Sequence, residues 1–436
     1  MIVKNAAPVL TECLASVRAL VEQMVVADTG STDGTPELAR RLGAEVVQIP
    51  WEDDFAQARN LALQPVKTDW VLALDADEEL DPRSVRHFPR LLKEPTVGGY
   101  LLPHRNYLPY RFDQGVYGSL VKASRDGVVP RARNAPAYLE VPVCRLFRRR
   151  PEIVFVGRIH ELVEPAIKAS GWKLVPAQDL LVHNFGALSS SGNDCSKREY
   201  YRHLGRLKVQ DTPDNPQAWM ELGLQEYQLK NYVAAIECFT RARALPQCPP
   251  FVFTSLAKLY VETGSSDRAL AVLNDPAAHH RVVAGEREHI RGDALYNLGR
   301  LEEARRCYRA ALDRLPEDAL IESKLGLTEV RLGQVAGGTG RLVHALQAAP
   351  QSFEVHDRLI KAYIVADMLP QAAEASERLL SGFGHPKMFV RAASIRFRLH
   401  DYQAAASHVE RGLQLFPGSP ELLQARSELQ QMQITG

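Results

Sequence analysis

The sequence lacks an excess of charge of either sign. Its 53 lysine and arginine residues balance 52 aspartate and glutamate residues, so the formal net charge is +1. Proteins that attract nucleic acids or anionic membranes through their overall field carry a marked basic excess. The charge balance therefore predicts that nucleic acid is not a partner of this chain.

Long apolar runs and clustered cysteines are also missing. No uncharged apolar stretch approaches the ~18 residues of a membrane-spanning helix. The start of the chain, MIVKNAAPVLTECLASVRAL, lacks the cationic segment and long apolar run of a signal peptide. The six cysteines contain no CxxC pair, which argues against a structural zinc site and a disulfide framework. We expect no transmembrane segment, reduced thiols and a cytoplasmic location.

What is present is the composition of a folded protein. Of the 436 residues, 45% are hydrophobic and 24% are charged, which are ordinary fractions for globular proteins. The length exceeds that of one typical domain. We therefore expect two or three domains.

The chain repeats itself from about residue 216 onward. Small residues recur at spacings of 34, 35, 34, 35 and 32 positions, at Ala235, Ala269, Ala304, Gly338, Ala373 and Ala405. Five of the six copies have another small residue twelve positions earlier, and the fifth copy has Lys361 there instead. A period near 34 residues is typical of the tetratricopeptide repeat, whose two amphipathic helices meet at small residues. The pattern predicts an all-α solenoid of about six repeats over residues 216–436.

One glycine-rich stretch in this region, from Gly337 to Arg341, could be taken for a phosphate-binding loop. It lacks the GxxxxGK[ST] pattern and follows no expected strand. Its place in the repeat predicts instead the start of a second helix.

Residues 1–190 alternate between short apolar runs and helical patterns. This alternation predicts an α/β domain with a mainly parallel sheet flanked by helices. Strands are expected at residues 2–3, 24–27, 46–49, 70–74, 100–104, 143–147 and 180–183. Three helices are expected: one that begins at Pro8, a second that ends at Arg41, and a third over residues 55–63. Residues 191–215 are expected to form a polar linker and a connecting helix.

Two of the expected strands end in acidic residues. Asp28 follows one strand, and Asp75 and Asp77 follow another. Ligands of open parallel sheets bind beyond the carboxyl ends of the strands, and residues two apart on an extended chain face the same way. Asp75 and Asp77 can therefore direct two carboxylates at one divalent cation that also binds substrate phosphates. Solvated loop acids are the alternative, because a D-x-D pattern is common.

Further motifs give these acids a context, because together they resemble glycosyltransferase family 2. The motifs are DTGSTDGT (28–35), FAQARN (55–60), DWVLALDADEEL (69–80) and VGRIHE (156–161), with MIVKN at the start and HNFG at 183–186. The resemblance covers roughly residues 1–190 and implies the GT-A fold, a Rossmann-like nucleotide-diphospho-sugar transferase domain. Bacterial members with added tetratricopeptide repeats are a known architecture. Some related enzymes glucosylate lipopolysaccharide cores, and others glycosylate peptides.

The resemblance implies roles in nucleotide-sugar binding for five residues. Asp28 corresponds to the acid that contacts the nucleotide base, and Thr29 and Gly30 would line that pocket. Arg59 corresponds to the cation that holds the nucleotide, and its guanidinium suits an anion. Asp75 would lie near the ribose.

The resemblance also implies a metal ligand and a catalytic base. Asp77 would bind Mn²⁺ or Mg²⁺ at the diphosphate, and His183 is a second metal candidate or a buried structural histidine. Glu161 is the candidate base that deprotonates the acceptor. His160 would support that base or bind a phosphate. The alternative for Glu161 is a salt bridge to Arg158.

The function expected from this resemblance is inverting, metal-dependent, hexosyltransferase-type glycosyl transfer. The donor would be a nucleotide-diphospho-sugar, with a UDP-sugar preferred, and the acceptor a glycan, a lipopolysaccharide or a peptide or protein. The solenoid would bind the acceptor or a partner protein. The alternative is an inactive tetratricopeptide scaffold with a vestigial nucleotide-sugar domain, suggested by the short first strand. A nucleotidyltransferase would need a basic triphosphate-binding loop, which Lys4 alone does not supply.

Overall fold

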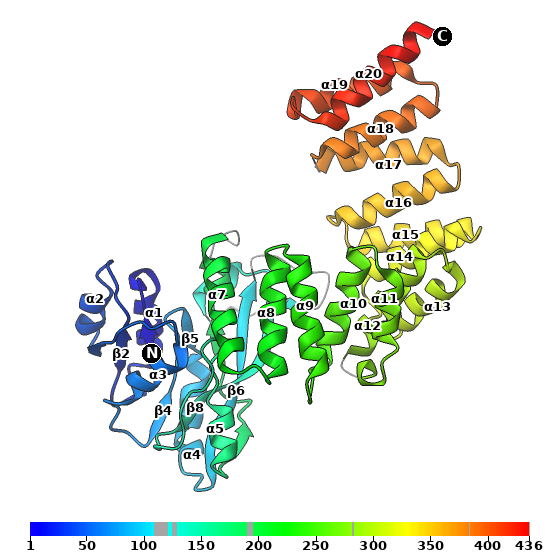
Figure 1. Cartoon of the computed structure of the whole chain (residues 1–436). Coiled ribbons are helices and arrows are strands. Elements are labelled where there is room, and N and C mark those ends of the chain that lie inside the picture. Colours follow the sequence, from blue (N-terminus) through cyan, green and yellow to red (C-terminus); the bar gives the residue numbers. More distant parts are fainter. Residues whose placement is uncertain (109–120, 124–128, 190–194, 281–282, 383, 436) are drawn as a thin grey trace. The chain divides into compact units, whose positions relative to one another are not determined.

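The structure is a computed structural model, and it describes residues 1–108, 121–123, 129–189, 195–280, 283–382 and 384–435. The chain divides into two compact units, Met1–Val252 and Phe253–Gly436 (Figure 1). The predicted linker falls partly on residues 191–194, which lie outside the described residues. The first unit includes the first predicted repeat, so the domain boundaries at 190 and 215 stay a prediction.

The N-terminal part of the first unit is a three-stranded parallel sheet in the order β1-β2-β3. Its strands and helices are β1 (Ile2–Val3), α1 (Ala7–Val17), β2 (Val25–Asp28), α2 (Thr35–Arg41) and β3 (Glu45–Gln48). A proline in the first turn of α1, where no amide donor is needed, helps to start that helix. Helix α1 buries Leu10, Cys13, Leu14 and Val17. The parallel sheet therefore matches the prediction from the alternating pattern.

A second, seven-stranded sheet follows, and it is mixed. Its members are β4 (Trp70–Leu72), β5 (Glu78–Leu80), β6 (Val97–Leu108), β7 (Val121–Ala123), β8 (Ala137–Arg148), β9 (Lys173–Pro176) and β10 (Val182–Asn184). The order is β4-β8-β6-β10-β5, with β7 on β8 and β9 on β6. Strands β6 and β8 pair antiparallel along most of their length. The prediction of a mainly parallel sheet is therefore wrong here, because antiparallel pairs need no helical crossover.

Helix α3 (Phe55–Leu63) connects the two sheets in the sequence and ends where the sequence predicts. Asp54 caps it by accepting a hydrogen bond of 2.9 Å from the Gln57 amide. Its buried face consists of small and aliphatic residues together with Arg59, which is 6% exposed. The other helices of this region are short: α4 (Phe88–Leu91), α5 (Glu164–Ala169), α6 (Gly186–Ser189) and the 3₁₀ segments Pro82–His87 and Pro130–Asn134.

Three longer helices complete the first unit: α7 (Cys195–Asp211), α8 (Pro216–Gln228) and α9 (Tyr232–Ala244). Helix α7 packs closely against α8 at Gly205, where any Cβ would collide with the Gln225 side chain. Lys208 of α7 forms an ion pair of 2.7 Å with Glu221 of α8, and Arg206 forms one of 2.8 Å with Glu226. These contacts join the first repeat to the connecting helix.

The second unit consists of further helices. They are α10 (Phe251–Glu262), α11 (Ser266–Leu273), α12 (Ala284–Asn297), α13 (Leu301–Leu312), α14 (Ala319–Arg331), α15 (Val335–Ala348), α16 (Phe353–Val365), α17 (Leu369–Gly382), α18 (Pro386–Arg398), α19 (Tyr402–Leu415) and α20 (Pro420–Thr435), with a 3₁₀ turn at Pro276–Ala278. Counted along the described chain from α8, the helices form six pairs followed by α20. This is compatible with about six repeats, and their number stays a prediction.

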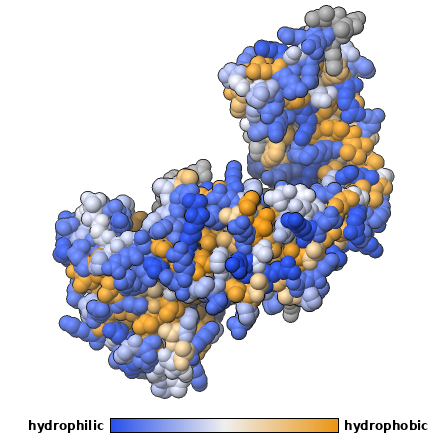
Figure 2. Space-filling model, viewed as in Figure 1, coloured by the Kyte–Doolittle hydropathy of each residue, from blue (hydrophilic) through white to orange (hydrophobic). Residues whose placement is uncertain are grey.

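The apolar side chains of these helices do not form a membrane span. On the face drawn in Figure 2, apolar residues are interspersed with hydrophilic ones. Among the helices of the described residues, none combines the length and the apolar character needed to cross a membrane.

Small residues allow the paired helices to touch, as the repeat pattern predicts. A Cβ on Gly326 of α14 would lie 2.7 Å from the Gly338 carbonyl oxygen of α15, and a Cβ on Gly338 would lie 2.5 Å from the Gly326 carbonyl oxygen. Gly338 is buried, and the stretch from Gly337 to Arg341 lies inside α15. The prediction of a helix here, and not a phosphate loop, is confirmed.

This contact predicts opposite effects for two glycines of α15. Gly338→Ala should destabilise the second unit by about 1–3 kcal/mol, because the added methyl group overpacks the contact between the two helices. Gly340→Ala is the matched control, because a Cβ on Gly340 would have open space for 4 Å around it among the described residues. It should stabilise the helix by about 0.5–1 kcal/mol through lower backbone entropy.

The unfolding of the first unit can be measured separately from that of the whole chain. All four tryptophans, Trp51, Trp70, Trp172 and Trp219, lie in the first unit. Thermal unfolding followed by circular dichroism at 222 nm should shift for both variants, whereas the tryptophan fluorescence transition should not. Equal melting of the two variants would contradict the assigned helix contact.

Candidate functional site

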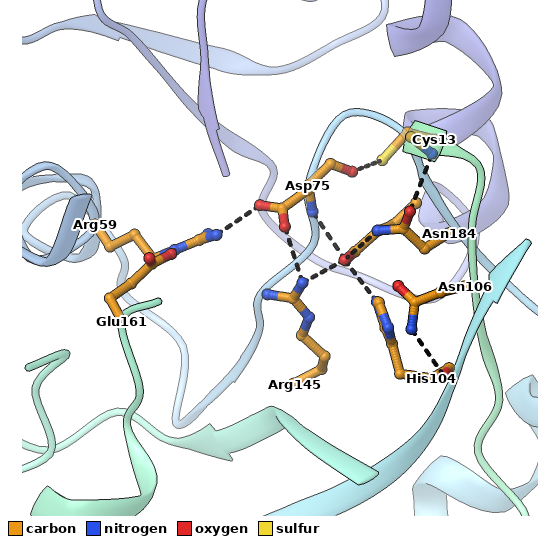
Figure 3. A network of polar contacts seen from close by, with 10 residues as sticks. Cys13, Arg59, Asp75, His104, Asn106, Arg145, Glu161 and Asn184 are labelled. Atoms are coloured by element: carbon orange, nitrogen blue, oxygen red, sulfur yellow. Dashed lines mark hydrogen bonds and ion pairs between the residues drawn. The ribbon is translucent and has the colours of Figure 1, made fainter. Parts of the chain in front are cut away.

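The site begins at the turn after β4, where Asp75 lies between two arginines. The Ala73 amide donates to the Arg145 carbonyl at 2.8 Å, which brings β8 alongside this turn. One carboxylate oxygen of Asp75 is 2.6 Å from Arg59 Nη2, and the other is 2.8 Å from Arg145 Nη2 (Figure 3). Burial would raise the pKa of Asp75, but the two guanidinium groups outweigh it and hold that pKa well below its usual range. Asp75 is therefore ionised and already paired.

A fully buried glutamate, Glu78, holds both Arg145 and the backbone of Asp75. Glu78 accepts hydrogen bonds from Arg145, from His104 Nε2 at 2.7 Å and from Asn184 Nδ2 at 3.3 Å. It also accepts the Asp75 amide at 3.0 Å. Four elements therefore converge on one carboxylate, which fixes the backbone that carries Asp75.

Glu161 reaches the same network from a tight loop. The amide and carbonyl groups of Val156 and Leu162 pair at 2.9 and 3.0 Å and close the loop around residues 157–161. The Glu161 carboxylate binds Arg59, so Arg59 is shared between Asp75 and Glu161 (Figure 3). Arg158 instead bonds Asp211 of α7 at 2.8 Å. The alternative in which Glu161 pairs with Arg158 is thus replaced by a pairing with Arg59.

His160 is placed differently from Glu161. It is exposed and adopts a positive φ of 53°, in the left-handed region that non-glycine residues rarely occupy. Its role beside the base stays a prediction.

Asp77 differs from the other acids because its carboxylate has no partner among the other described residues. No hydrogen bond or ion pair from another described residue reaches its carboxylate oxygens, although its own backbone donates a hydrogen bond to them, and its carbonyl accepts the Phe185 amide at 3.0 Å. Burial raises the pKa of Asp77, and the negative charges of Asp75 and Glu78 raise it further, which outweighs the hydrogen bond from its own backbone. Gly186 leaves room for this carboxylate, since a Cβ there would collide with Asp77 Oδ2.

Asp28 lies at the end of β2 and is 1% exposed. Its carboxylate accepts the amides of Gly30 and Ser31 at 3.1 Å. Burial would raise the pKa of Asp28, but hydrogen bonds from Ser31, Gly30 and Gln48 outweigh it and lower that pKa. Gly30 has a φ of 101°, and the Thr29 hydroxyl donates to the Val3 carbonyl. Asp28 and Val3 together therefore fix the turn that contains Thr29 and Gly30. Contact with a nucleotide base stays a prediction.

His183 lies in a buried aromatic stack. Its ring is fully buried and nearly parallel to the rings of Tyr107 and Phe185. Nδ1 is 2.9 Å from the Tyr107 hydroxyl, and Nε2 is 3.0 Å from Asp81 Oδ2. A metal role for His183 stays a prediction, and these contacts favour its other interpretation, a structural histidine.

The chemistry of the acids decides which of them could hold a cation. Within the described part of the chain, no group of three or more His, Cys, Asp and Glu side chains is arranged as a metal site. Magnesium is commonly held by one or two carboxylates together with substrate phosphates. The unpaired carboxylate of Asp77 fits that arrangement, because it needs no partner to be displaced.

Two parts of the chain match known protein families. Residues 1–152 match the family described as Glycosyl transferase family 2, and residues 224–336 match the Tetratricopeptide repeat-like domain. The chain carries a family 2 glycosyltransferase domain. A tetratricopeptide repeat-like domain follows it, which confirms both resemblances and the predicted fold class. Glu161 and His183 lie beyond the residues matched to the glycosyltransferase family.

Individual relatives are named either for repeats or for glycosyltransferase activity. A TPR repeat-containing protein of Synechococcus elongatus is 28% identical over 363 residues, which are 81% of this chain and 73% of that protein. An uncharacterized glycosyltransferase of Rickettsia felis is 39% identical over 80 residues, covering 18% of this chain and 28% of that protein. The glycosyltransferase SunS of Bacillus subtilis is 24% identical over 240 residues, covering 54% of this chain and 50% of SunS. The two matches to glycosyltransferases support the same activity for this chain, although each covers half or less of the relative.

Several residues of the network escape local sequence reasoning. Arg145, His104 and Asn184 lie on strands β8, β6 and β10, far from the acidic motif in the sequence. Arg145 and His104 give no signal beyond being polar residues within short apolar runs, whereas Asn184 belongs to the HNFG motif at 183–186. Neither the motif nor its spacing shows that all three meet at Glu78.

The network predicts a large stability difference between neighbouring acids. Glu78→Gln should destabilise the first unit by about 3–5 kcal/mol, because it leaves the buried Arg145 without part of its countercharge. Glu79→Gln is the matched control, because Glu79 pairs with the partly exposed Arg131 at 3.0 Å; it should cost about 1 kcal/mol. Thermal unfolding followed by tryptophan fluorescence checks this, and similar shifts in both variants would argue against a structural role for Glu78.

Proposed function

We propose that this protein is an inverting glycosyltransferase of the hexosyltransferase type that uses a nucleotide-diphospho-sugar, preferably a UDP-sugar. The observation that carries the proposal is the contrast between Asp75 and Asp77. Asp75 is ionised and bound by two arginines, whereas Asp77 has a raised pKa and no partner among the other described residues. One acid is thus structural in the network and the other is available to a ligand.

The balance of charge supports Mn²⁺ or Mg²⁺ as the cofactor. Four carboxyl groups, those of Asp75, Asp77, Glu78 and Glu161, lie in this region with two guanidinium groups, those of Arg59 and Arg145, so the acids outnumber the guanidinium groups by two. Asp77 would hold the divalent cation together with the donor diphosphate. When bound, the cation stabilises negative charge on the departing nucleoside diphosphate.

The remaining donor contacts follow the family pattern. Asp28, Thr29 and Gly30 would form the pocket for the nucleotide base. Arg59 would bind the donor anion, since a guanidinium can pair with phosphate oxygens through two hydrogen bonds. Asp75 would lie beside the ribose and keep Arg59 in place.

Glu161 is proposed as the catalytic base. The acceptor hydroxyl oxygen attacks the anomeric carbon, its proton passes to Glu161, and the bond from that carbon to the diphosphate breaks, with the electron pair leaving on the nucleoside diphosphate. Arg59 restrains Glu161 before the donor binds. A donor phosphate that takes over Arg59 would free this carboxylate for proton transfer. His160 is proposed to assist at the exposed side of the loop.

The solenoid is proposed to bind the acceptor, a glycan, a lipopolysaccharide or a peptide or protein, or a partner protein. Repeats of this type offer extended surfaces. The six cysteines are not joined in disulfides, which supports the proposed cytoplasmic location. The second candidate function is an inactive repeat scaffold, because the relative of Synechococcus elongatus is named only for its repeats and β1 has two residues.

A donor panel tests the enzymatic proposal. UDP-, GDP- and dTDP-sugars are incubated with the full chain and Mn²⁺ or Mg²⁺, and nucleotide release is measured. We expect release from a UDP-sugar, and a loss of about 100-fold or more in Asp77→Asn, as for removal of one electrostatic contact to the transition state. Asp179→Asn is the control, because Asp179 is an exposed acid paired with Arg90. Absence of release from every donor would favour the scaffold.

A truncation tests the role of the solenoid. A chain that ends at Val252 retains α8, whose Glu221 and Glu226 pair with α7. It should keep donor hydrolysis and the tryptophan unfolding transition of the full chain, but should no longer transfer labelled sugar to acceptors in a cell extract. Equal loss of hydrolysis and transfer would count against a separate acceptor-binding role.

A further inference from the structure

Helix α7 lies outside the matched glycosyltransferase residues, yet it holds the loop that carries Glu161. Lys208 Nζ donates to the Ile159 carbonyl at 2.8 Å and pairs with Glu221 at 2.7 Å, and Lys208 is 8% exposed. Asp211 accepts a hydrogen bond from Arg158 Nε at 2.8 Å. Two residues near the end of α7 thus fix the backbone and a side chain of the 157–161 loop. The helix is therefore part of the surroundings of the site.

Helix α7 also contacts α3, one helical turn before Arg59. Phe55 and Arg59 are four residues apart in α3 and lie on one face. The ring of Tyr201 from α7 lies 6.5 Å from the Phe55 ring, measured between centroids. Burial raises the pKa of Tyr201, and the charges of Glu161, Asp75 and Asp77 raise it further. The phenol therefore stays protonated, and its ring lies beside a residue one helical turn before Arg59.

The hydroxyl of Tyr201 has no hydrogen-bond partner among the described residues. A half-buried phenol hydroxyl usually finds one. The preceding residue does: Tyr200 accepts a hydrogen bond from Trp51 Nε1 at 2.6 Å and donates to Asp53. Two adjacent tyrosines of α7 thus differ, since Tyr200 docks the helix and Tyr201 keeps a free donor near the acids.

We propose that Tyr201 is a substrate-binding residue supplied by α7, and that its hydroxyl hydrogen-bonds the transferred sugar of the donor. This inference rests on the proposed glycosyltransferase function. A sugar is neutral and rich in hydroxyls, so it can donate to carboxylates and accept from a phenol at the same place. Lys197 Nζ lies 6.0 Å from the centroid of the Tyr201 ring, so the hydroxyl, and not the ring face, makes the proposed contact.

Binding measurements on the full chain test this role. UDP and the UDP-sugar that gives turnover are titrated calorimetrically into the wild type, Tyr201→Phe and Tyr200→Phe, with Mn²⁺ present. Tyr201→Phe should weaken UDP-sugar binding about tenfold, as for one lost hydrogen bond, and leave UDP binding unchanged. Tyr200→Phe is the matched control and should change neither affinity. Retained UDP binding also shows that each variant is folded.

The outcomes separate this inference from the proposed function. Unchanged UDP-sugar affinity in Tyr201→Phe, or an equal loss for UDP and UDP-sugar, overturns the sugar contact and leaves the glycosyltransferase proposal intact. A wild-type chain that binds neither ligand overturns both.

Discussion

The arrangement of the first unit depends on the sharing of Arg59 between two carboxylates. A guanidinium group buried in a helix face must be paired, because an isolated charge there would be strongly unfavourable. Asp75 and Glu161 provide that pairing from the turn after β4 and from the loop closed by Val156 and Leu162. The helix, the acidic turn and the loop therefore hold one another, and the loop is held in turn by α7 through Lys208. A ligand anion at Arg59 would act on all of these elements together.

Much of this organisation can be predicted from the sequence because it is encoded locally. The helix over residues 55–63 ends where its apolar pattern ends, and the small residues at a period near 34 give the helix pairs. The acidic motif correctly places Asp75 and Asp77 together after a strand. These features are visible as regular spacings along the sequence, a few positions within a helix or strand and about 34 positions between repeats.

The rest depends on contacts between distant segments. Arg145 reaches Asp75 because β8 pairs antiparallel with both β4 and β6, and no local pattern specifies that register. The helix over residues 195–211 is predictable, but its docking on the loop and the different surroundings of Tyr200 and Tyr201 are not. The prediction of a mainly parallel sheet is wrong for the seven-stranded sheet for the same reason, because strand directions are fixed by pairing and not by the alternation that identifies a strand.

The small space beside Asp77 also changes how relatives of this chain should be compared. Gly186 leaves that space, and any larger residue would push the carboxylate away from its present position. A related sequence could therefore retain Asp75, Ala76 and Asp77 and still place the second carboxylate differently, through one substitution more than a hundred positions away. Sorting active from inactive homologues by those three residues alone would misclassify such a protein, whereas inspecting both positions would not.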